Sequence, residues 1–271
     1  MKNVIVVGSF DDLRARQVRF LEEAAKTGDV YALVWPDAAV KKTTGKPPRF
    51  PAGERLYLVQ GLRFVKHARI VSGPISLDNI STLDVHPEFW AVTEDEANEE
   101  KRKFCADFDI DLQVVPEKDL LVIPSVPPLN PRLAHRKKVI VTGCFDWFHS
   151  GHIQFFEEAS GYGDLFVDVG SDSNIRLLKG KGHPLFPQAT RLYMVSAARH
   201  VKQAFIGSGF GWLDAAPEIN RIRPEIYLVN EDGDRPEKRE FCEERGIQYV
   251  VLKRLPKSGL PRRDSTDLRG F

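Results

Sequence analysis

Two histidines three residues apart, His149 and His152, are the side chains of this sequence best suited to chemistry. Gly151 stands between them, and a short β-branched run ending at Gly143 precedes them. We therefore expect a strand, a turn and the start of a helix, with both imidazoles on one side of that helix. Helix N-termini attract anions, and imidazoles placed there can donate hydrogen bonds to a phosphate on which negative charge develops. The alternative is a pair of structural histidines.

The chain contains the same opening segment twice, and only one copy carries the histidines. The sequence KNVIVVGSFD at 2–11 returns as KKVIVTGCFD at 137–146, but RARQ follows the first copy where HSGH follows the second. A gap-free comparison of 51–73 with 187–209 gives 12 identities in 23 positions. Repeats of this length predict that both halves share one fold. The first half is then an internal control without the histidines.

Alternating strand and helix patterns would position these residues. Apolar β-branched runs predict strands at 4–7, 31–35, 68–71, 113–115, 139–141, 165–170, 204–206, 226–229 and 248–252. Amphipathic patterns predict helices at 18–26, 52–66, 99–108, 153–160, 189–202 and 236–245. The fold class expected is α/β, with two tandem Rossmann-like domains, each a doubly wound parallel sheet.

A proline-rich segment at 116–136 is interpreted as the connection between the domains. We place the boundary near residue 134, so that 1–134 forms the first domain, including the connection, and 135–271 forms the second. Each half is long enough to bury a core of its own.

Composition excludes several classes of function. The 271 residues carry a formal net charge of only +1, which argues against bulk binding of nucleic acid or anionic membranes. Three widely spaced cysteines form no disulfide framework or zinc motif. No apolar stretch is long enough to insert into a membrane, and no secretory leader is recognised. A cytoplasmic protein is expected.

The segment after the second opening strand resembles the signature G-x-F-D-x-x-H-x-G-H of the cytidylyltransferase-like nucleotidyltransferases. This family includes the glycerol-3-phosphate, choline-phosphate and ethanolamine-phosphate cytidylyltransferases. The matching residues are Gly143, Phe145, Asp146, His149, Gly151 and His152. Cys144 occupies a variable position within this nucleotide-binding loop and is interpreted as a packing residue.

Further segments resemble the family in the same order. A lysine segment at 172–181 supplies Lys179 and Lys181, a helix of the R-x-x-x-V type begins at Arg191, and a late acidic loop contains Asn230 and Asp232. Near the end of the chain, Ser265 and Thr266 partly match a closing motif that begins a helix under the triphosphate. Two observations count against a complete match. Arg191 has a twin at Arg55 in the first half, so a structural ion pair is the alternative to phosphate binding. Lys202-Gln203 stands where the family usually has Val-Asp.

The resemblance implies transfer of CMP from CTP to a phosphorylated small alcohol, with release of pyrophosphate. His149 and His152 would stabilise the transition state, while Lys179, Lys181 and Arg191 neutralise charge on the phosphates. Mg²⁺ is expected mainly on the triphosphate, with Asp146 as the one candidate protein ligand. Two alternatives remain open. One is an ATP-dependent adenylyltransferase of the flavin, heptose-phosphate or pantetheine-phosphate type, since 265–269 also fits an S-T-x-x-R ending that includes Arg269. The other is a non-catalytic nucleotide-binding scaffold.

The first half is expected to be inactive because Arg14 and Gln17 replace the two histidines. It resembles a degenerate second protomer fused into the chain, as in the tandem plan of ethanolamine-phosphate cytidylyltransferase. An intramolecular pseudo-dimer follows, and a homodimer of whole chains remains an option. Arg14 and Arg16 are cations at an expected helix start and could hold an anion there, so a regulatory ligand is the alternative to a purely structural role.

Overall fold

The computed structural model describes residues 2–72, 86–265 and 268. It divides the chain into two compact units, residues 1–123 and 124–271. Each unit contains one five-stranded parallel sheet with helices packed against it. Within the described residues, no helix is both long enough and apolar enough to cross a membrane.

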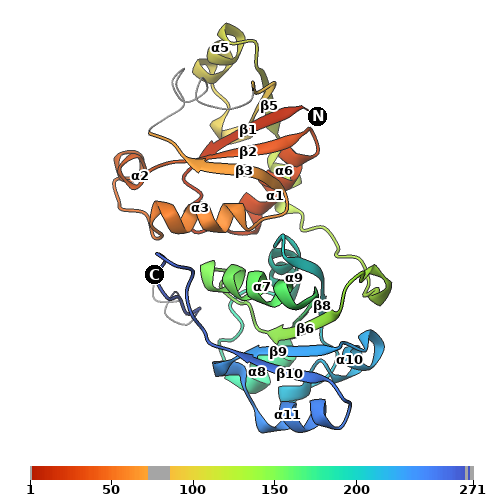
Figure 1. Ribbon diagram of the computed structural model, residues 1–271. Coiled ribbons are helices and arrows are strands. Elements are labelled where there is room, and N and C mark those ends of the chain that lie inside the picture. The colour runs from red at the N-terminus through yellow and green to blue at the C-terminus, as the bar shows by residue number, and fades with distance from the viewer. Residues whose placement is uncertain (1, 73–85, 266–267, 269–271) are drawn as a thin grey trace. The chain divides into compact units, whose positions relative to one another are not determined.

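The N-terminal unit has the strand order β3-β2-β1-β4-β5. Helix α5 packs on one face of this sheet, against a core that includes Ile5, Trp90 and Cys105, while α1 and α3 contact strands β1 to β3 (Figure 1). The elements are β1 (Asn3–Gly8), α1 (Ala15–Ala25), β2 (Asp29–Val34), α2 (Asp37–Thr44), α3 (Ala52–Gln60), β3 (Val65–Ile70), β4 (Phe89–Thr93), α5 (Glu99–Asp107), β5 (Asp111–Val115) and α6 (Glu117–Leu121).

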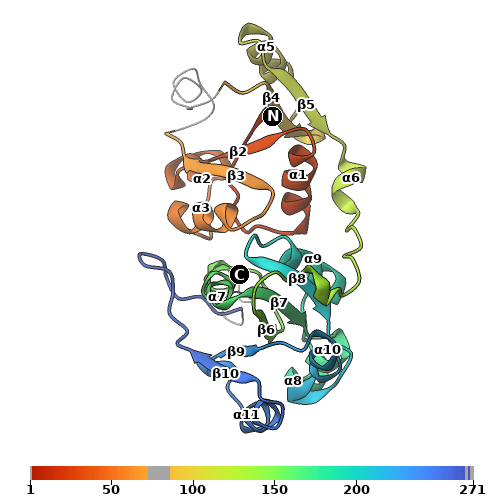
Figure 2. The ribbon, with the colours of Figure 1, turned by 45° about the vertical axis from the view of Figure 1, so that its right-hand side comes forward.

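The C-terminal unit has the order β8-β7-β6-β9-β10, which is the same topology. Helices α10 and α11 pack on one face against Ile140, Phe166 and Tyr227, while α7 and α9 contact the strands from the other side (Figure 2). The elements are β6 (Lys138–Gly143), α7 (Ser150–Tyr162), β7 (Asp164–Val169), α8 (Asp172–Lys179), α9 (Gln188–Ser196), β8 (Val201–Ile206), α10 (Ala216–Ile222), β9 (Ile226–Asn230), α11 (Pro236–Glu243) and β10 (Gln248–Leu252).

The two sheets agree in register as well as in order. In the first, Val7 lies opposite Leu33, and in the second the equivalent Thr142 lies opposite Asp168. Ile5 pairs with Trp90 as Ile140 pairs with Tyr227. The expected fold class, two Rossmann-like parallel sheets in tandem, is confirmed. Because equivalent positions can be identified residue by residue, differences between the units can be compared directly.

Sequence patterns missed or overextended several elements. Strand β4 lies between β1 and β5 in the first sheet but was not predicted, and helices α2, α6, α8 and α10 were also missed. The predicted helices at 52–66 and 189–202 end early, at Gln60 and Ser196, because Val65 and Val201 already begin strands. Short connections leave little sequence signal between a helix and the strand that follows it.

The proline-rich segment is shared between the units. Its first part forms α6, which packs on α1 of the N-terminal unit. Its later part is held by Gln203 in β8, whose Oε1 accepts from the Asn130 amide at 2.8 Å and whose Nε2 donates to the Pro128 carbonyl at 2.8 Å. The division between the compact units falls between Ile123 and Pro124 along the chain. The division into functional domains stays a prediction.

Candidate functional site

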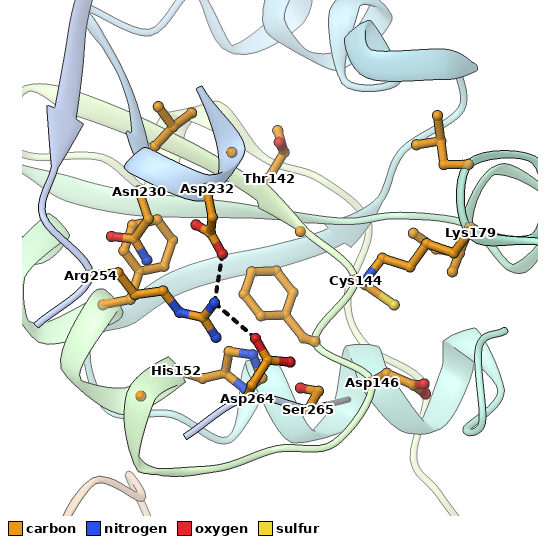
Figure 3. Close-up of a pocket in the computed structure, with 18 of the residues that line it drawn as sticks. Thr142, Cys144, Asp146, His152, Lys179, Asn230, Asp232, Arg254, Asp264 and Ser265 are labelled. Atoms are coloured by element: carbon orange, nitrogen blue, oxygen red, sulfur yellow. Dashed lines mark hydrogen bonds and ion pairs between the residues drawn. The ribbon is translucent and has the colours of Figure 1, made fainter. Parts of the chain in front are cut away.

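A cavity of about 260 Å³ lies at the carboxyl ends of the strands in the C-terminal unit. Eleven of the residues predicted for the site line it, and they come from the loop after β6, the end of α8, the end of β9 and the segment near the C-terminus (Figure 3). They are Gly143, Cys144, Phe145, Asp146, His149, Gly151, His152, Lys179, Asn230, Asp232 and Ser265. Distant parts of the chain thus meet at the switch point of the sheet, where ligands bind in such folds.

His149 is the N-cap of α7 and has a defined tautomer. Its Nδ1 accepts a hydrogen bond from the Gly151 amide at 3.1 Å, so in the neutral ring the proton is on Nε2. That Nε2 has no hydrogen-bond partner among the described residues, although the side chain is buried. A Cβ at Gly151 would lie 3.0 Å from the imidazole, which explains the glycine. The ring therefore offers one N–H donor to a ligand.

His152 stacks on His149, with ring centres 3.9 Å apart, and the Phe145 ring supports it from the side at 5.2 Å. Burial, and then the nearby charge of Arg254, lowers the pKa of His149 to about 3. Burial and the neighbouring His149 place the pKa of His152 well below its usual value. Both rings are consequently neutral at neutral pH, because a charged imidazole would be poorly solvated there.

Two cations stand at opposite sides of the cavity. Lys179, the last residue of α8, reaches toward it from one side, and Arg254 lies on the other (Figure 3). Arg254 donates from Nη1 to Asp232 at 2.7 Å and to Asp264 at 3.0 Å. Sequence reasoning missed Arg254 and Asp264. The only available signal was a basic residue just after the last strand, at the edge where parallel strands present ligand-binding groups.

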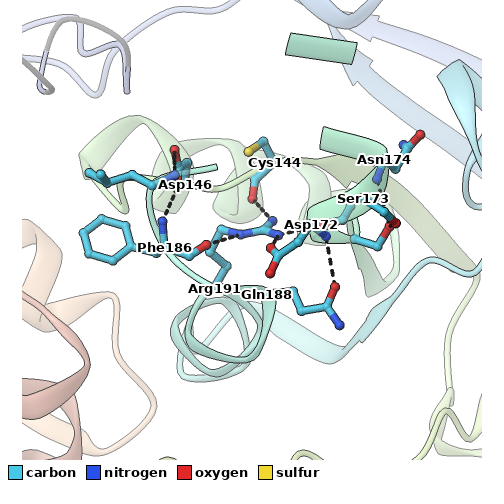
Figure 4. Close-up of polar contacts among 11 residues, drawn as sticks. Cys144, Asp146, Asp172, Ser173, Asn174, Phe186, Gln188 and Arg191 are labelled. Carbon is cyan, nitrogen blue, oxygen red and sulfur yellow. Dashed lines mark hydrogen bonds and ion pairs between the residues drawn. The ribbon is translucent and has the colours of Figure 1, made fainter. Parts of the chain in front are cut away.

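Arg191 does not line the cavity, so the phosphate-binding role expected for it is not supported. Its Nε donates to the Phe186 carbonyl at 2.9 Å, Nη1 to Cys144 at 2.7 Å, and Nη2 to Gly170 at 2.8 Å and to the Asp172 carboxylate at 2.7 Å (Figure 4). The buried guanidinium donates its hydrogen bonds to three backbone carbonyls and the Asp172 carboxylate. It ties the histidine loop to the ends of two other connections.

Asp146 completes this arrangement, which we call the Asp146–Arg191 bracket. Its carboxylate accepts from the amides of Leu185 and Phe186, each at 2.8 Å (Figure 4). The first unit repeats the arrangement. Asp11 accepts from the amides of Arg49 and Phe50, and Arg55 donates to the carbonyls of Phe50, Ser9 and Trp35 and to Asp37. Residues shared by the two copies are therefore explained by structure.

The same contacts bear on the expected metal. Asp146, the one candidate ligand for Mg²⁺, is buried and already binds two amides. Among the residues that the structure describes, no group of three or more histidine, cysteine, aspartate or glutamate side chains is placed to hold a metal ion. The protein groups in the described part of the chain do not fit a resident Mg²⁺ site.

The remaining predicted residues vary in placement. Lys181 is exposed on the glycine turn after α8 and does not line the cavity. Ser265 lines it, but its hydroxyl already donates to the Trp147 carbonyl at 3.1 Å. Cys144 is partly exposed on the wall, and its role stays a prediction. Thr266 and Arg269 lie outside the described residues.

The equivalent loop of the first unit is occupied by ion pairs. Arg14 pairs with Asp12 at 2.9 Å, and Arg16 pairs with Glu117 at 2.5 Å and Asp95 at 3.1 Å. Gln17, in place of the second histidine, accepts from the Arg14 amide and caps helix α1. Both arginines are paired with carboxylates in this structure, and the anion site considered for them stays a prediction. The inactivity of this half stays a prediction.

Comparison with known proteins finds a family match within the C-terminal unit. Residues 140–267 match the family described as cytidylyltransferase-like. A protein named FAD synthase from Methanocella arvoryzae is 32% identical over 136 residues, which are 49% of this chain and 93% of that protein. One of the same name from Aciduliprofundum boonei is 35% identical over 49% of this chain and 84% of that protein. The crystal structure of a lipopolysaccharide core biosynthesis protein from Thermoplasma volcanium is 26% identical and covers 48% of this chain and 99% of its own, with a TM-score of 0.38.

Replacing Arg191 by methionine should destabilise the C-terminal unit. Three backbone carbonyls and one carboxylate lose their donors, so we expect the free energy of unfolding to fall by about 3 kcal/mol or more. Urea denaturation followed by circular dichroism measures the change. Arg176→Met, at an exposed position of α8, is the control and should have little effect. Equal midpoints of urea denaturation for the two variants would contradict a stabilising role for the Asp146–Arg191 bracket.

The neutral histidines should weaken folding in mild acid. His149 is neutral when folded but binds a proton in the unfolded chain below about pH 6.5, so stability falls as the pH drops from there toward 4. Relative to His149→Asn, the wild type should lose about 1.4 kcal/mol per pH unit between about pH 6 and 4. Urea titrations at several pH values measure this. As a control, Gln154→Ala on the same helix should show the same pH dependence of the free energy of unfolding as the wild type. If His149→Asn also shows that dependence, the buried ring is charged and the prediction is wrong.

Proposed function

The chain belongs to the cytidylyltransferase-like family, and from that premise we propose that it is an adenylyltransferase that makes a flavin dinucleotide from ATP and flavin mononucleotide (FMN). The observation that carries this choice is the set of relatives named FAD synthase, which are 32–36% identical and matched over most of their own length. CTP and a phospho-alcohol, preferred from the signature alone, become the second candidate, because the signature is common to enzymes that use either base.

The layout of the cavity supports a reaction between two bound substrates. Asn230 ends β9, Asp232 follows that strand and Arg254 follows β10, whereas Lys179 ends the helix after β7. Strand β6, whose loop carries the histidines, lies between β9 and β7 in the sheet. We assign the β9–β10 side to the nucleotide and the β7–β8 side to the acceptor. The histidines then stand where the two phosphates meet.

In the proposed step, an oxygen of the FMN phosphate attacks the α-phosphorus of ATP. The bond from that phosphorus to the oxygen bridging the β-phosphorus breaks, and pyrophosphate leaves with that electron pair. His149 donates its Nε2–H to a non-bridging oxygen of the α-phosphate, where charge increases in the transition state. Because Nε2 of the neutral ring has no hydrogen-bond partner among the described residues, no hydrogen bond of this atom to those residues has to break when the ligand binds. Lys179 offsets charge on the acceptor phosphate, and Arg254 does so on the triphosphate side.

The base and the acceptor are tested together. We expect the full chain to form FAD from ATP and FMN with release of pyrophosphate, and to form little product when CTP replaces ATP or glycerol 3-phosphate replaces FMN. Liquid chromatography of the products, with a coupled pyrophosphate assay, measures both. Efficient turnover of CTP with a phospho-alcohol would establish the second candidate instead. A scaffold would release no pyrophosphate with any pair.

The histidine role predicts a specific kinetic defect. His149→Ala removes the donor to the transferring phosphate, so kcat should fall by about 100-fold or more while the Kd for ATP changes much less. Arg14→Ala, at the position of the first unit equivalent to His149, is the matched control and should retain kcat. A His149→Ala enzyme with undiminished kcat would rule out transition-state stabilisation by this ring.

A further inference from the structure

Polar groups that the proposed reaction does not use line the cavity on its acceptor side and, from helix α11, next to the end of β6. Trp212 and Asp214 belong to the segment between β8 and α10, and Lys238 belongs to α11; all three line the cavity. Asp214 and Lys238 are 8% and 5% exposed, whereas Trp212 remains 41% exposed. An indole surface therefore lies beside two buried ionisable groups, which have opposite hydrogen-bonding roles when both are charged.

Lys238 uses only part of its hydrogen-bonding capacity within the described residues. Its ammonium carries three N–H groups and makes one hydrogen bond within the described residues, to Thr142 Oγ1 at 3.2 Å. Burial lowers the pKa of Lys238, and the nearby Asp214 opposes that shift. A buried donor without an acceptor is costly. A ligand oxygen at this end of the cavity would remove that cost.

The fold itself does not require polar side chains on the strands beneath the cavity, which we call the polar floor. Three strand positions beneath the cavity are polar in the second unit and apolar at the equivalent positions of the first. They are Thr142, Asp168 and Tyr227, against Val7, Leu33 and Trp90. Asp168 is fully buried, neither of its oxygens makes a hydrogen bond of normal geometry among the described residues, and burial raises its pKa well above the usual value. Such groups reduce stability, so their presence only in the unit with the histidines points to binding.

The segment that carries Trp212 and Asp214 is held in place. Asn174, fully buried in α8, donates to Asp214 Oδ2 at 2.7 Å and accepts from the Gly211 amide at 2.7 Å. The Arg235 guanidinium lies 4.4 Å from the centre of the Trp212 ring. Groups fixed before binding lose little entropy when a ligand arrives. This end of the cavity is consequently suited to selective recognition.

We propose that Trp212, Asp214 and Lys238 select an acceptor with a planar ring that carries an N–H beside a carbonyl group. The indole stacks on the ring, Lys238 donates to the carbonyl oxygen, and Asp214 accepts from the N–H. The pyrimidine edge of a flavin has this pattern, with N3–H between two carbonyls. The inference rests on the proposed function, because it assigns this end to the acceptor rather than to the nucleotide.

The test compares two ligands and two matched variants. Calorimetric titration of the full chain, saturated with α,β-methylene ATP, measures the Kd for FMN and for FMN methylated at N3. Loss of the N–H should weaken binding to the wild type by about tenfold or more. Lys238→Met should weaken FMN binding by about tenfold to a hundredfold. Lys101→Met is the control, since Lys101 is the repeat-equivalent lysine and lies 5.5 Å over the Trp90 ring as Lys238 lies over Tyr227.

Equal affinity for FMN and its N3-methyl form, or no binding of FMN at all, overturns the inference. So does wild-type affinity in a folded Lys238→Met protein. If that variant does not fold, the comparison of the two ligands on the wild type decides alone. Formation of FAD by the wild type is assayed separately. If FAD forms while the two ligands bind equally, this inference fails and the proposed function stands; if FAD does not form, the proposed function fails on its own evidence.

Discussion

The site depends on one buried guanidinium. Arg191 joins the carbonyls of the loop after β6, the end of β7 and the segment before α9, while Asp146 binds the amides of that last segment. Loops at the carboxyl edge of a parallel sheet have few backbone partners of their own, so a multidentate side chain must satisfy them. Without it, the turn that presents His149 would have no fixed position relative to Lys179 and the cavity floor.

The two units separate what the fold needs from what the site needs. Both have a bracket of aspartate and arginine, and both hold a phenylalanine in the left-handed region, with φ of 49° at Phe10 and 52° at Phe145. Strain of this kind persists only where surrounding contacts impose it. The histidines and the polar floor occur in one unit alone. Because both units have the same strand order and register, these differences reflect the chemistry of the second unit.

Low solvation is the second constraint on the site. The histidines are buried and neutral. Within the part of the chain that the structure describes, the buried Lys238 makes one hydrogen bond and the buried Asp168 makes none of normal geometry. Each of these groups lowers stability in the absence of a ligand. In the same surroundings, hydrogen bonds to a phosphate or to a polar ring are stronger than in water. The unit therefore gives up some stability to hold donors that a ligand can use.

Sequence alone determined the alternation of strands and helices, the repeat and the half that carries the histidines, because these depend on local patterns and on spacing along one loop. It could not determine the use of Arg191, since a guanidinium suits a phosphate as well as a backbone carbonyl and only burial decides between them. Nor could it find Arg254, Asp214 or Lys238 as cavity residues. Tertiary structure decided these roles, because the cavity forms where the ends of β6, β7, β9 and β10 converge, and residues far apart in the chain become neighbours only there.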